Sequence, residues 1–156
     1  SGIRWDDIHF NDSEYEKWAA YGQSKTAASL LAIEVDKRMK DSGIRAFGVH
    51  PGGIMTPLQR HLEQEEMVAL GWMDEDGQPT ERVAKMFKTP TQGASTSLWA
   101  ATSPQLNDIG GVYCENCEVA APTDDGENAR FIGVNDWAVD SEEASRLWDE
   151  TERMLS

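Results

Sequence analysis

The chain has 156 residues, a formal net charge of −14 at pH 7, 39% hydrophobic residues and six tryptophans. This length is sufficient for a single domain with a hydrophobic core, and six tryptophans argue against a disordered chain. The negative charge disfavours nucleic acid and anionic membranes as partners, because both would repel it. No apolar run approaches the roughly 18 residues of a membrane span, and the N-terminus lacks the pattern of a signal peptide. We therefore expect a cytoplasmic protein with no membrane segment in this chain.

The first half of the chain predicts a loop, a long helix and a strand. Residues 1–14 are polar and rich in aspartate and asparagine, which favour turns. A helix is predicted over 15–40, where apolar residues recur at steps of three and four, and Gly43 is a suitable C-terminal stop. The residues that carry this periodicity are Ala28, Leu31, Ala32, Val35 and Met39. A short strand is expected over 44–49, and the Pro-Gly-Gly turn at 51–53 ends it.

Three helices are predicted after this turn. The first covers 57–70, and the acidic, glycine-containing segment 74–77 breaks the pattern after it. The second covers 80–88. The third opens with the capping box at 89–92, in which proline occupies the first helical position, and it runs to Ala101.

The last third of the chain predicts one strand, one loop and one helix. A strand is expected over 110–114, and the segment 122–128 is a loop rich in aspartate, glycine, proline and asparagine. The final helix is predicted over 141–154, with Asp140 and Glu143 as candidates for its N-terminal cap. One stripe of this helix is expected to be buried and contains Ala144, Leu147, Trp148, Thr151 and Leu155.

The two cysteines, Cys114 and Cys117, form a C-x-x-C pattern. A zinc site needs a second pair of ligands, and a redox motif of the thioredoxin kind lies at a strand-to-helix turn. Cys114 instead continues an apolar run, and the three histidines are scattered along the sequence. We therefore expect neither a metal site nor a disulfide.

Tyr21 and Lys25 are the strongest candidates for catalytic residues. Residues four apart lie on one face of a helix, so the phenol and the ammonium are expected side by side. A nearby cation stabilises the phenolate and so prepares a tyrosine for proton transfer. A Tyr-x-x-x-Lys pattern also occurs on ordinary surface helices, so the neighbouring segments must decide between the two interpretations.

These neighbouring segments resemble the short-chain dehydrogenase/reductase (SDR) family, from just before its active-site tyrosine to its C-terminus. The resemblance lies in Trp18 to Leu31 (WAAYGQSKTAASLL) and in Val49 to Leu58 (VHPGGIMTPL). The segment Gly2 to Asp7 (GIRWDD) is similar to the branch that contains the retinol dehydrogenases and the WW-domain oxidoreductases. The resemblance implies an α/β fold in which residues 1–156 form the C-terminal portion of one Rossmann-like, doubly wound parallel sheet.

Helices that alternate with strands also favour an α/β class, but two strands are too few for a parallel sheet covered on both faces. None of the 13 glycines lies in a pattern that cradles phosphate. The expectation is that the N-terminal nucleotide-binding half is absent from this chain.

The resemblance further implies a role for each matching residue. Tyr21 would exchange a proton with a carbonyl or alcohol substrate, and Lys25 would support it and bind the ribose of NAD or NADP. The residues expected at the cofactor are Tyr21, Lys25, Pro51, Gly52, Gly53, Ile54 and Thr56. A small-molecule substrate, lipophilic in the branch concerned, and a homo-oligomer of the full-length protein are also implied.

The segment 58–88 would form a lid over the substrate. Its large apolar residues are Met67, Leu70, Trp72, Met73, Met86 and Phe87. These residues are suited to an apolar pocket, and equally to ordinary packing between amphipathic helices.

Two other interpretations of the chain stay open. The family's active-site serine has no counterpart here, because Ser1 and Ser13 lie outside its sequence context. Without that serine and the glycine-rich loop, the chain is alternatively a non-catalytic remnant or an interaction module, and this portion alone is expected to be inactive. A third interpretation is a redox module that uses the C-x-x-C pattern.

Overall fold

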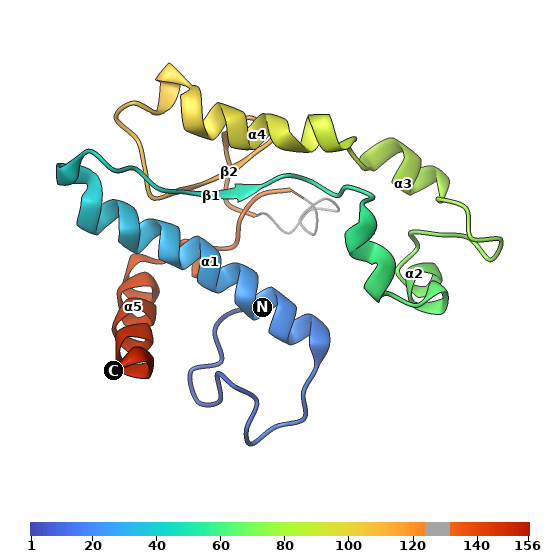
Figure 1. Cartoon of the computed structure of the whole chain (residues 1–156), viewed down its shortest axis with the longest axis horizontal. Coiled ribbons are helices and arrows are strands. Elements are labelled where there is room, and N and C mark those ends of the chain that lie inside the picture. Colours follow the sequence, from blue (N-terminus) through green and yellow to red (C-terminus); the bar gives the residue numbers. More distant parts are fainter. Residues whose placement is uncertain (124–131) are drawn as a thin grey trace.

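A small sheet lies between two helical layers in the computed structural model, which describes residues 1–123 and 132–156 (Figure 1). The α-helices of the described residues are α1 (Lys17–Met39), α2 (Gln64–Ala69), α3 (Glu81–Met86), α4 (Pro90–Thr102) and α5 (Ser141–Leu155). The strands are β1 (Phe47–His50), β2 (Val112–Glu115) and β3 (Glu118–Val119), and the short 3-10 helices are η1 (Lys40–Ser42), η2 (Pro57–His61), η3 (Pro104–Leu106) and η4 (Asp136–Ala138). Helix α4 covers one face of the sheet, and α1 with α5 lies on the other (Figure 1).

The sheet has the order β1-β2-β3, with β1 and β2 parallel and β3 antiparallel to β2. The two predicted strands are present, and the observed strands begin two or three residues later than predicted. The third strand was not expected. It follows a two-residue turn in which Asn116 and Cys117 have φ values of 50° and 60°, the conformation of tight hairpin turns. Both cysteines are free thiols, with Cys114 buried in β2 and Cys117 exposed in this turn.

Helix α1 begins and ends at clear local signals. The Glu16 carboxylate caps its first turn by accepting hydrogen bonds from the N–H groups of Trp18 and Ala19. After η1, the chain leaves through Gly43, whose φ of 77° is the left-handed conformation that glycine adopts without a steric cost. The predicted glycine stop is confirmed, and the helix starts two residues later than the predicted 15–40.

The predicted apolar stripe of α1 is not its buried face. Leu31 is 48% exposed, whereas the buried residues of the helix are Gln23, Thr26, Ser29, Leu30, Glu34 and Asp36. The buried polar residues have partners, such as the Ser29 hydroxyl, which donates to the carbonyl of Ala138. The buried polar groups of α1 that bond outside the helix are thus tied to the N-terminal segment, to η4 and to the residues just before β1.

The expected buried stripe of α5 is only partly correct. Ala144 is buried and Leu147 is half-buried, but Leu155 is 83% exposed. An apolar groove of about 490 Å³ lies between α1 and α5, and Leu147, Trp148, Thr151 and Leu155 line it, so this stripe is only partly covered. Asp140 caps the helix as predicted. Glu143 does not cap it, because its carboxylate accepts a 2.5 Å hydrogen bond from the Trp5 indole.

The predicted helix over 57–70 is interrupted. Thr56 and Gln59 form a capping box around η2, and Leu62 is then extended before α2 begins at Gln64. Helix α3 is also shorter than the predicted 80–88. It ends at Met86 because Lys88 pairs with Ile54 in an isolated parallel bridge.

Helix α4 follows the sequence prediction closely. Thr89 and Gln92 form the expected capping box, and Pro90 occupies the first turn.

Of the predicted loop at 122–128, residues 124–128 lie outside the described part of the chain. Among residues 1–123 and 132–156, no helix combines the length and the apolar character needed to cross a bilayer.

Candidate active site

Tyr21 and Lys25 share one exposed face of α1. The Lys25 ammonium nitrogen lies 5.0 Å from the centroid of the Tyr21 ring, as the four-residue helical spacing predicts. The Tyr21 side chain is about half exposed, with a residue exposure of 51%. No carboxylate of the described residues forms an ion pair with Lys25. The phenol and the ammonium are therefore open to a ligand.

Trp18 contacts Tyr21, and Tyr113 interacts electrostatically with Tyr21. The Trp18 ring meets it edge to face, with centroids 6.0 Å apart and planes at 81°. Tyr113 of β2 is close enough for its pKa to be raised by Tyr21, after the larger effects of burial and of Glu115. Gly48 makes room for Tyr113, because a Cβ at Gly48 would lie only 3.0 Å from the Tyr113 ring. Sequence reasoning missed Tyr113, whose only signal was its place in a predicted strand.

The turn after β1 consists of bare backbone packed against the end of the lid segment. Gly52 has a φ of +92°, which side-chain-bearing residues rarely adopt. A Cβ at Gly52 would lie 2.8 Å from Lys88 Cδ, and one at Gly53 would lie 2.9 Å from Phe87 Cε1. The Lys88 N–H also donates to the Gly53 carbonyl at 2.8 Å. Phe87 and Lys88, at the end of the segment 58–88, therefore hold this turn in place.

The rest of this turn is held by Gln59 and by α4. The Gln59 amide oxygen accepts from Thr56 N–H at 2.7 Å, and its amide nitrogen donates to the Ile54 carbonyl at 3.0 Å. Gly93 of α4 lies directly under the Ile54 side chain, since a Cβ there would be 2.1 Å from Ile54 Cδ1. These contacts give the segment from Pro51 to Thr56 a defined shape.

A charged cluster that the sequence did not reveal lies at the ends of β1 and β2. His50 Nδ1 lies 3.9 Å from the buried carboxylate of Glu115, which also accepts from Gly133 N–H at 2.6 Å. The pKa of His50 lies below its ordinary value. Burial and the nearby Lys88 ammonium lower this pKa by more than the Glu115 carboxylate raises it. The Lys88 ammonium donates to the Asn116 side chain at 2.7 Å.

The predicted site residues therefore come from two neighbouring elements. Tyr21 and Lys25 belong to α1, which packs against β1, and β1 leads into the turn at 51–56. Carboxyl ends of parallel strands are where ligands bind in open α/β sheets. Within the described part of the chain, no hydrogen bond or ion pair joins the side chains of Tyr21 and Lys25 directly to the turn.

The two upstream serines are engaged elsewhere. The Ser1 hydroxyl donates to the Ala19 carbonyl, and the Ser13 hydroxyl donates to Asp7. Ser1 lies against Gly22, where a Cβ would come within 2.8 Å of its hydroxyl oxygen. Gly22 in the Tyr-Gly-Gln-Ser-Lys segment is therefore a packing position for the N-terminal residues.

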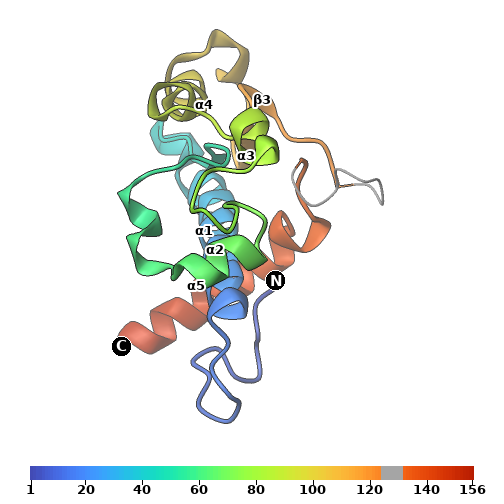
Figure 2. The same ribbon diagram turned by 90° about the vertical axis from the view of Figure 1, so that its right-hand side faces the viewer.

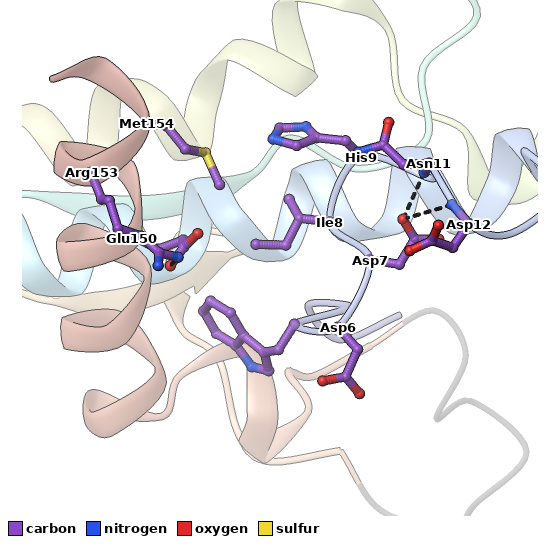
Figure 3. A pocket seen from close by; sticks show the side chains of 10 residues that line it. Asp6, Asp7, Ile8, His9, Asn11, Asp12, Glu150, Arg153 and Met154 are labelled. Carbon is purple, nitrogen blue, oxygen red and sulfur yellow. Dashed lines mark hydrogen bonds and ion pairs between the residues drawn. The ribbon is translucent and has the colours of Figure 1, made fainter.

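A separate open cavity of about 370 Å³ lies between the N-terminal segment and the end of α5 (Figure 3). Its lining residues are Trp5, Asp6, Asp7, Ile8, His9, Asn11, Asp12, Glu150, Arg153 and Met154. Asp7 closes the local turn, and its pKa is lowered chiefly by the Ser13 hydroxyl. Within the described residues, no group of three or more His, Cys, Asp or Glu side chains is arranged to hold a metal ion.

Known proteins match the chain over nearly its whole length, although no protein-family model matches it. A Streptomyces lividans protein named probable oxidoreductase is 42% identical over 145 residues, which are 93% of this chain and 48% of that protein. A short-chain dehydrogenase/reductase of Penicillium roqueforti is 35% identical over 156 residues, 100% of this chain and 43% of that protein. Retinol dehydrogenase 13 of Mus musculus is 29% identical, and the match covers 98% of this chain and 41% of that protein.

One solved structure, of an uncharacterized protein from Mycobacterium paratuberculosis, matches with a TM-score of 0.55. The match has 22% sequence identity and covers 97% of this chain and 44% of that one, and it concerns the fold alone. The chain spans less than half the length of the curated relatives described above.

Proposed function

We propose that this chain supplies the proton-transferring residues of a nicotinamide-dependent oxidoreductase. The proposal starts from its homology to the C-terminal half of short-chain dehydrogenase/reductases. The relatives are named as oxidoreductases, which supports this general class of enzyme. The proposed reaction is hydride transfer between NAD or NADP and a carbonyl or alcohol carbon. The observation that carries the proposal is the open pair of Tyr21 and Lys25 on one face of α1.

In this mechanism, Tyr21 donates its phenolic proton to the carbonyl oxygen during reduction and removes the proton from the alcohol during oxidation. The exposed phenol is accessible for this step. The adjacent Lys25 ammonium stabilises the negative charge that the phenol oxygen carries after it has lost the proton.

The residues present fit a nicotinamide cofactor through a free cationic donor. The Lys25 ammonium forms no ion pair with the described residues, so its donors are available to ribose hydroxyls. The residues proposed to hold the cofactor are Tyr21, Lys25, Pro51, Gly52, Gly53, Ile54 and Thr56. A bound nicotinamide would supply or accept the hydride.

The aromatic residues of the lid segment favour an apolar substrate. Trp72 and Phe87 meet edge to face with ring centroids 5.7 Å apart, and Phe87 lies against Gly53. An aromatic pair next to the proposed cofactor turn would exclude water and favour a lipophilic carbonyl or alcohol. The substrate class is thus part of the proposal.

The proposal also includes the organisation of the whole protein. Residues 1–156 would be the C-terminal part of one Rossmann-like domain, with the catalytic helix, the last strands and the lid. The partly exposed apolar groove between α1 and α5 supports a homo-oligomer of the full-length protein. The free thiols of Cys114 and Cys117 agree with a reducing compartment such as the cytoplasm.

The first test is a fluorescence titration with NADH and NADPH that uses the six tryptophans as reporters. The chain is compared with a longer polypeptide that adds an upstream nucleotide-binding half. We expect saturable binding in the longer polypeptide, and Lys25→Ala should weaken it. Absence of binding in both would refute the proposal and favour a non-catalytic remnant or interaction module.

A further inference from the structure

The lid segment contacts the first turn of the catalytic helix through one carboxylate. Glu66 of α2 accepts from the Lys17 ammonium at 2.5 Å with one oxygen and from the Trp18 indole N–H at 3.1 Å with the other. Glu66 is 48 or 49 residues away from these partners in sequence, and α2 lies beside the N-terminal part of α1 (Figure 2). Both oxygens of Glu66 are therefore used on two consecutive residues.

Trp18 connects this contact to the proposed proton donor. Its ring meets the Tyr21 ring edge to face, with the centroids 6.0 Å apart. The Lys17 ammonium also lies 5.9 Å from the centroid of the Trp18 ring, within the range of a cation–π contact. Glu66, Trp18 and Tyr21 thus form one continuous chain of contacts from the lid to the catalytic helix.

We propose that Glu66 is a positioning residue: it latches the lid segment onto α1 and, through Trp18, sets the orientation of the Tyr21 phenol. This inference rests on the proposed function for the role of Tyr21, and on geometry alone for the latch. Closure of the lid and alignment of the proton donor would then be a single event.

The surroundings of Glu66 separate it from an ordinary surface ion pair. Most exposed ion pairs contribute little, because water competes for both partners. The Glu66 side chain is only 20% exposed, and it binds a neutral indole donor as well as a cation. Elsewhere, the lid segment is held at its two ends, by Gln59 on Ile54 and by Lys88 on Gly53. Glu66 supplies a contact between these ends.

The latch can be measured without any catalytic assay, by hydrogen–deuterium exchange of Glu66→Ala. Glu65→Ala is the matched control, since Glu65 is an exposed acidic residue in the same first turn of α2. We expect amide exchange in 64–70 to become about fivefold faster in Glu66→Ala only, with α5 unchanged. Equal exchange in the two variants would overturn the latch.

The orientation of Tyr21 can be followed by NMR of tyrosine labelled with ¹³C at the phenolic carbon. The chain has three tyrosines, and Tyr21→Phe identifies the relevant resonance. We expect Glu66→Ala and Trp18→Ala to shift this resonance, and Trp18→Phe, which keeps a ring beside Tyr21 but lacks the indole N–H that binds Glu66, to shift it as Glu66→Ala does. An unshifted resonance in Glu66→Ala would overturn the positioning role.

Steady-state kinetics separate this inference from the proposed function. In an active enzyme, Glu66→Ala should lower kcat roughly tenfold, a misalignment effect, while the KM for the cofactor stays unchanged. A wild-type protein without turnover would refute the proposed function, yet exchange and NMR would still decide the latch. Turnover with an unchanged kcat in Glu66→Ala would refute the positioning role alone.

Discussion

Replacement of Asp36 by asparagine tests how α1 is held on the sheet. The Asp36 side chain is 8% exposed, and its carboxylate accepts hydrogen bonds from Arg45 Nε at 2.8 Å, Arg45 Nη2 at 3.0 Å and Ala46 N–H at 3.1 Å. These contacts join the last turns of α1 to the segment that enters β1. Gly110 lies against the pair, because a Cβ there would be 1.9 Å from the carboxylate. The substitution keeps the shape of the side chain and removes its charge.

The expected cost follows from these contacts. Hydrogen bonds to charged groups contribute about 1.5–3 kcal/mol each when they are protected from water. Arg45 is 29% exposed, which weakens the pair, and asparagine still offers one acceptor. We therefore expect Asp36→Asn to lower the free energy of unfolding by about 2–3 kcal/mol. For a protein of this size, such a loss lowers Tm by about 5–10 °C.

The assay is urea unfolding of wild type, Asp36→Asn and the control Asp41→Asn, which removes an exposed aspartate five residues further on. The hydrogen bond to Arg45 lowers the pKa of Asp36 below its ordinary value of 3.8. The stability that this pair provides is thus complete above that value and is lost as the pH falls through the lowered pKa. The difference between wild type and Asp36→Asn should stay constant near neutral pH and shrink below 3.8. Equal unfolding of Asp36→Asn and Asp41→Asn at neutral pH would contradict the reasoning.

Other substitutions give further tests. Tyr21→Phe should lower turnover by about 10²–10⁴-fold, the range for loss of a general acid, and leave unfolding nearly unchanged; near-normal rates would exclude the mechanism. Lys25→Ala should weaken turnover and NAD(P)H binding together, and an effect on only one of them would argue against its double role. Gly52→Ala should cost about 1–2 kcal/mol of stability because its φ of +92° strains any side-chain-bearing residue, whereas Gly2→Ala, with open space around it, should cost almost nothing in the same unfolding assay. Leu30→Ala removes a fully buried side chain and should lower the free energy of unfolding by about 3–5 kcal/mol; a smaller loss would mean that the core beside α1 collapses around the cavity.

Local chemistry was sufficient to predict most of the helices. The capping box at Thr89, the cap at Asp140 and the glycine stop at Gly43 all occur where the sequence indicated. Each signal depends on atoms only a few residues apart, so it operates in any tertiary context. The pairing of Tyr21 with Lys25 is of the same kind, because helical periodicity alone brings the two side chains together.

The sequence-based predictions were wrong where contacts with residues far away in the chain decide the conformation. The helix expected over 57–70 is divided by the bracing of Gln59 on the turn, and β3 exists because two residues of positive φ reverse the chain after β2. The apolar stripe of α1 predicted the helix but not its orientation, since hydrogen bonds to buried polar groups such as Ser29 hold the opposite face inward.

The sequence by itself therefore determined the α/β class, the long helix α1 and the spacing of Tyr21 and Lys25, all through contacts between residues close in the chain. Only the tertiary structure decided what surrounds them. The approach of Tyr113 to Tyr21, the contact of Glu66 with the first turn of α1, and the position of Lys88 against Gly52 each join separate elements. Contacts of this kind depend on how helices and strands pack, a property that no local pattern encodes.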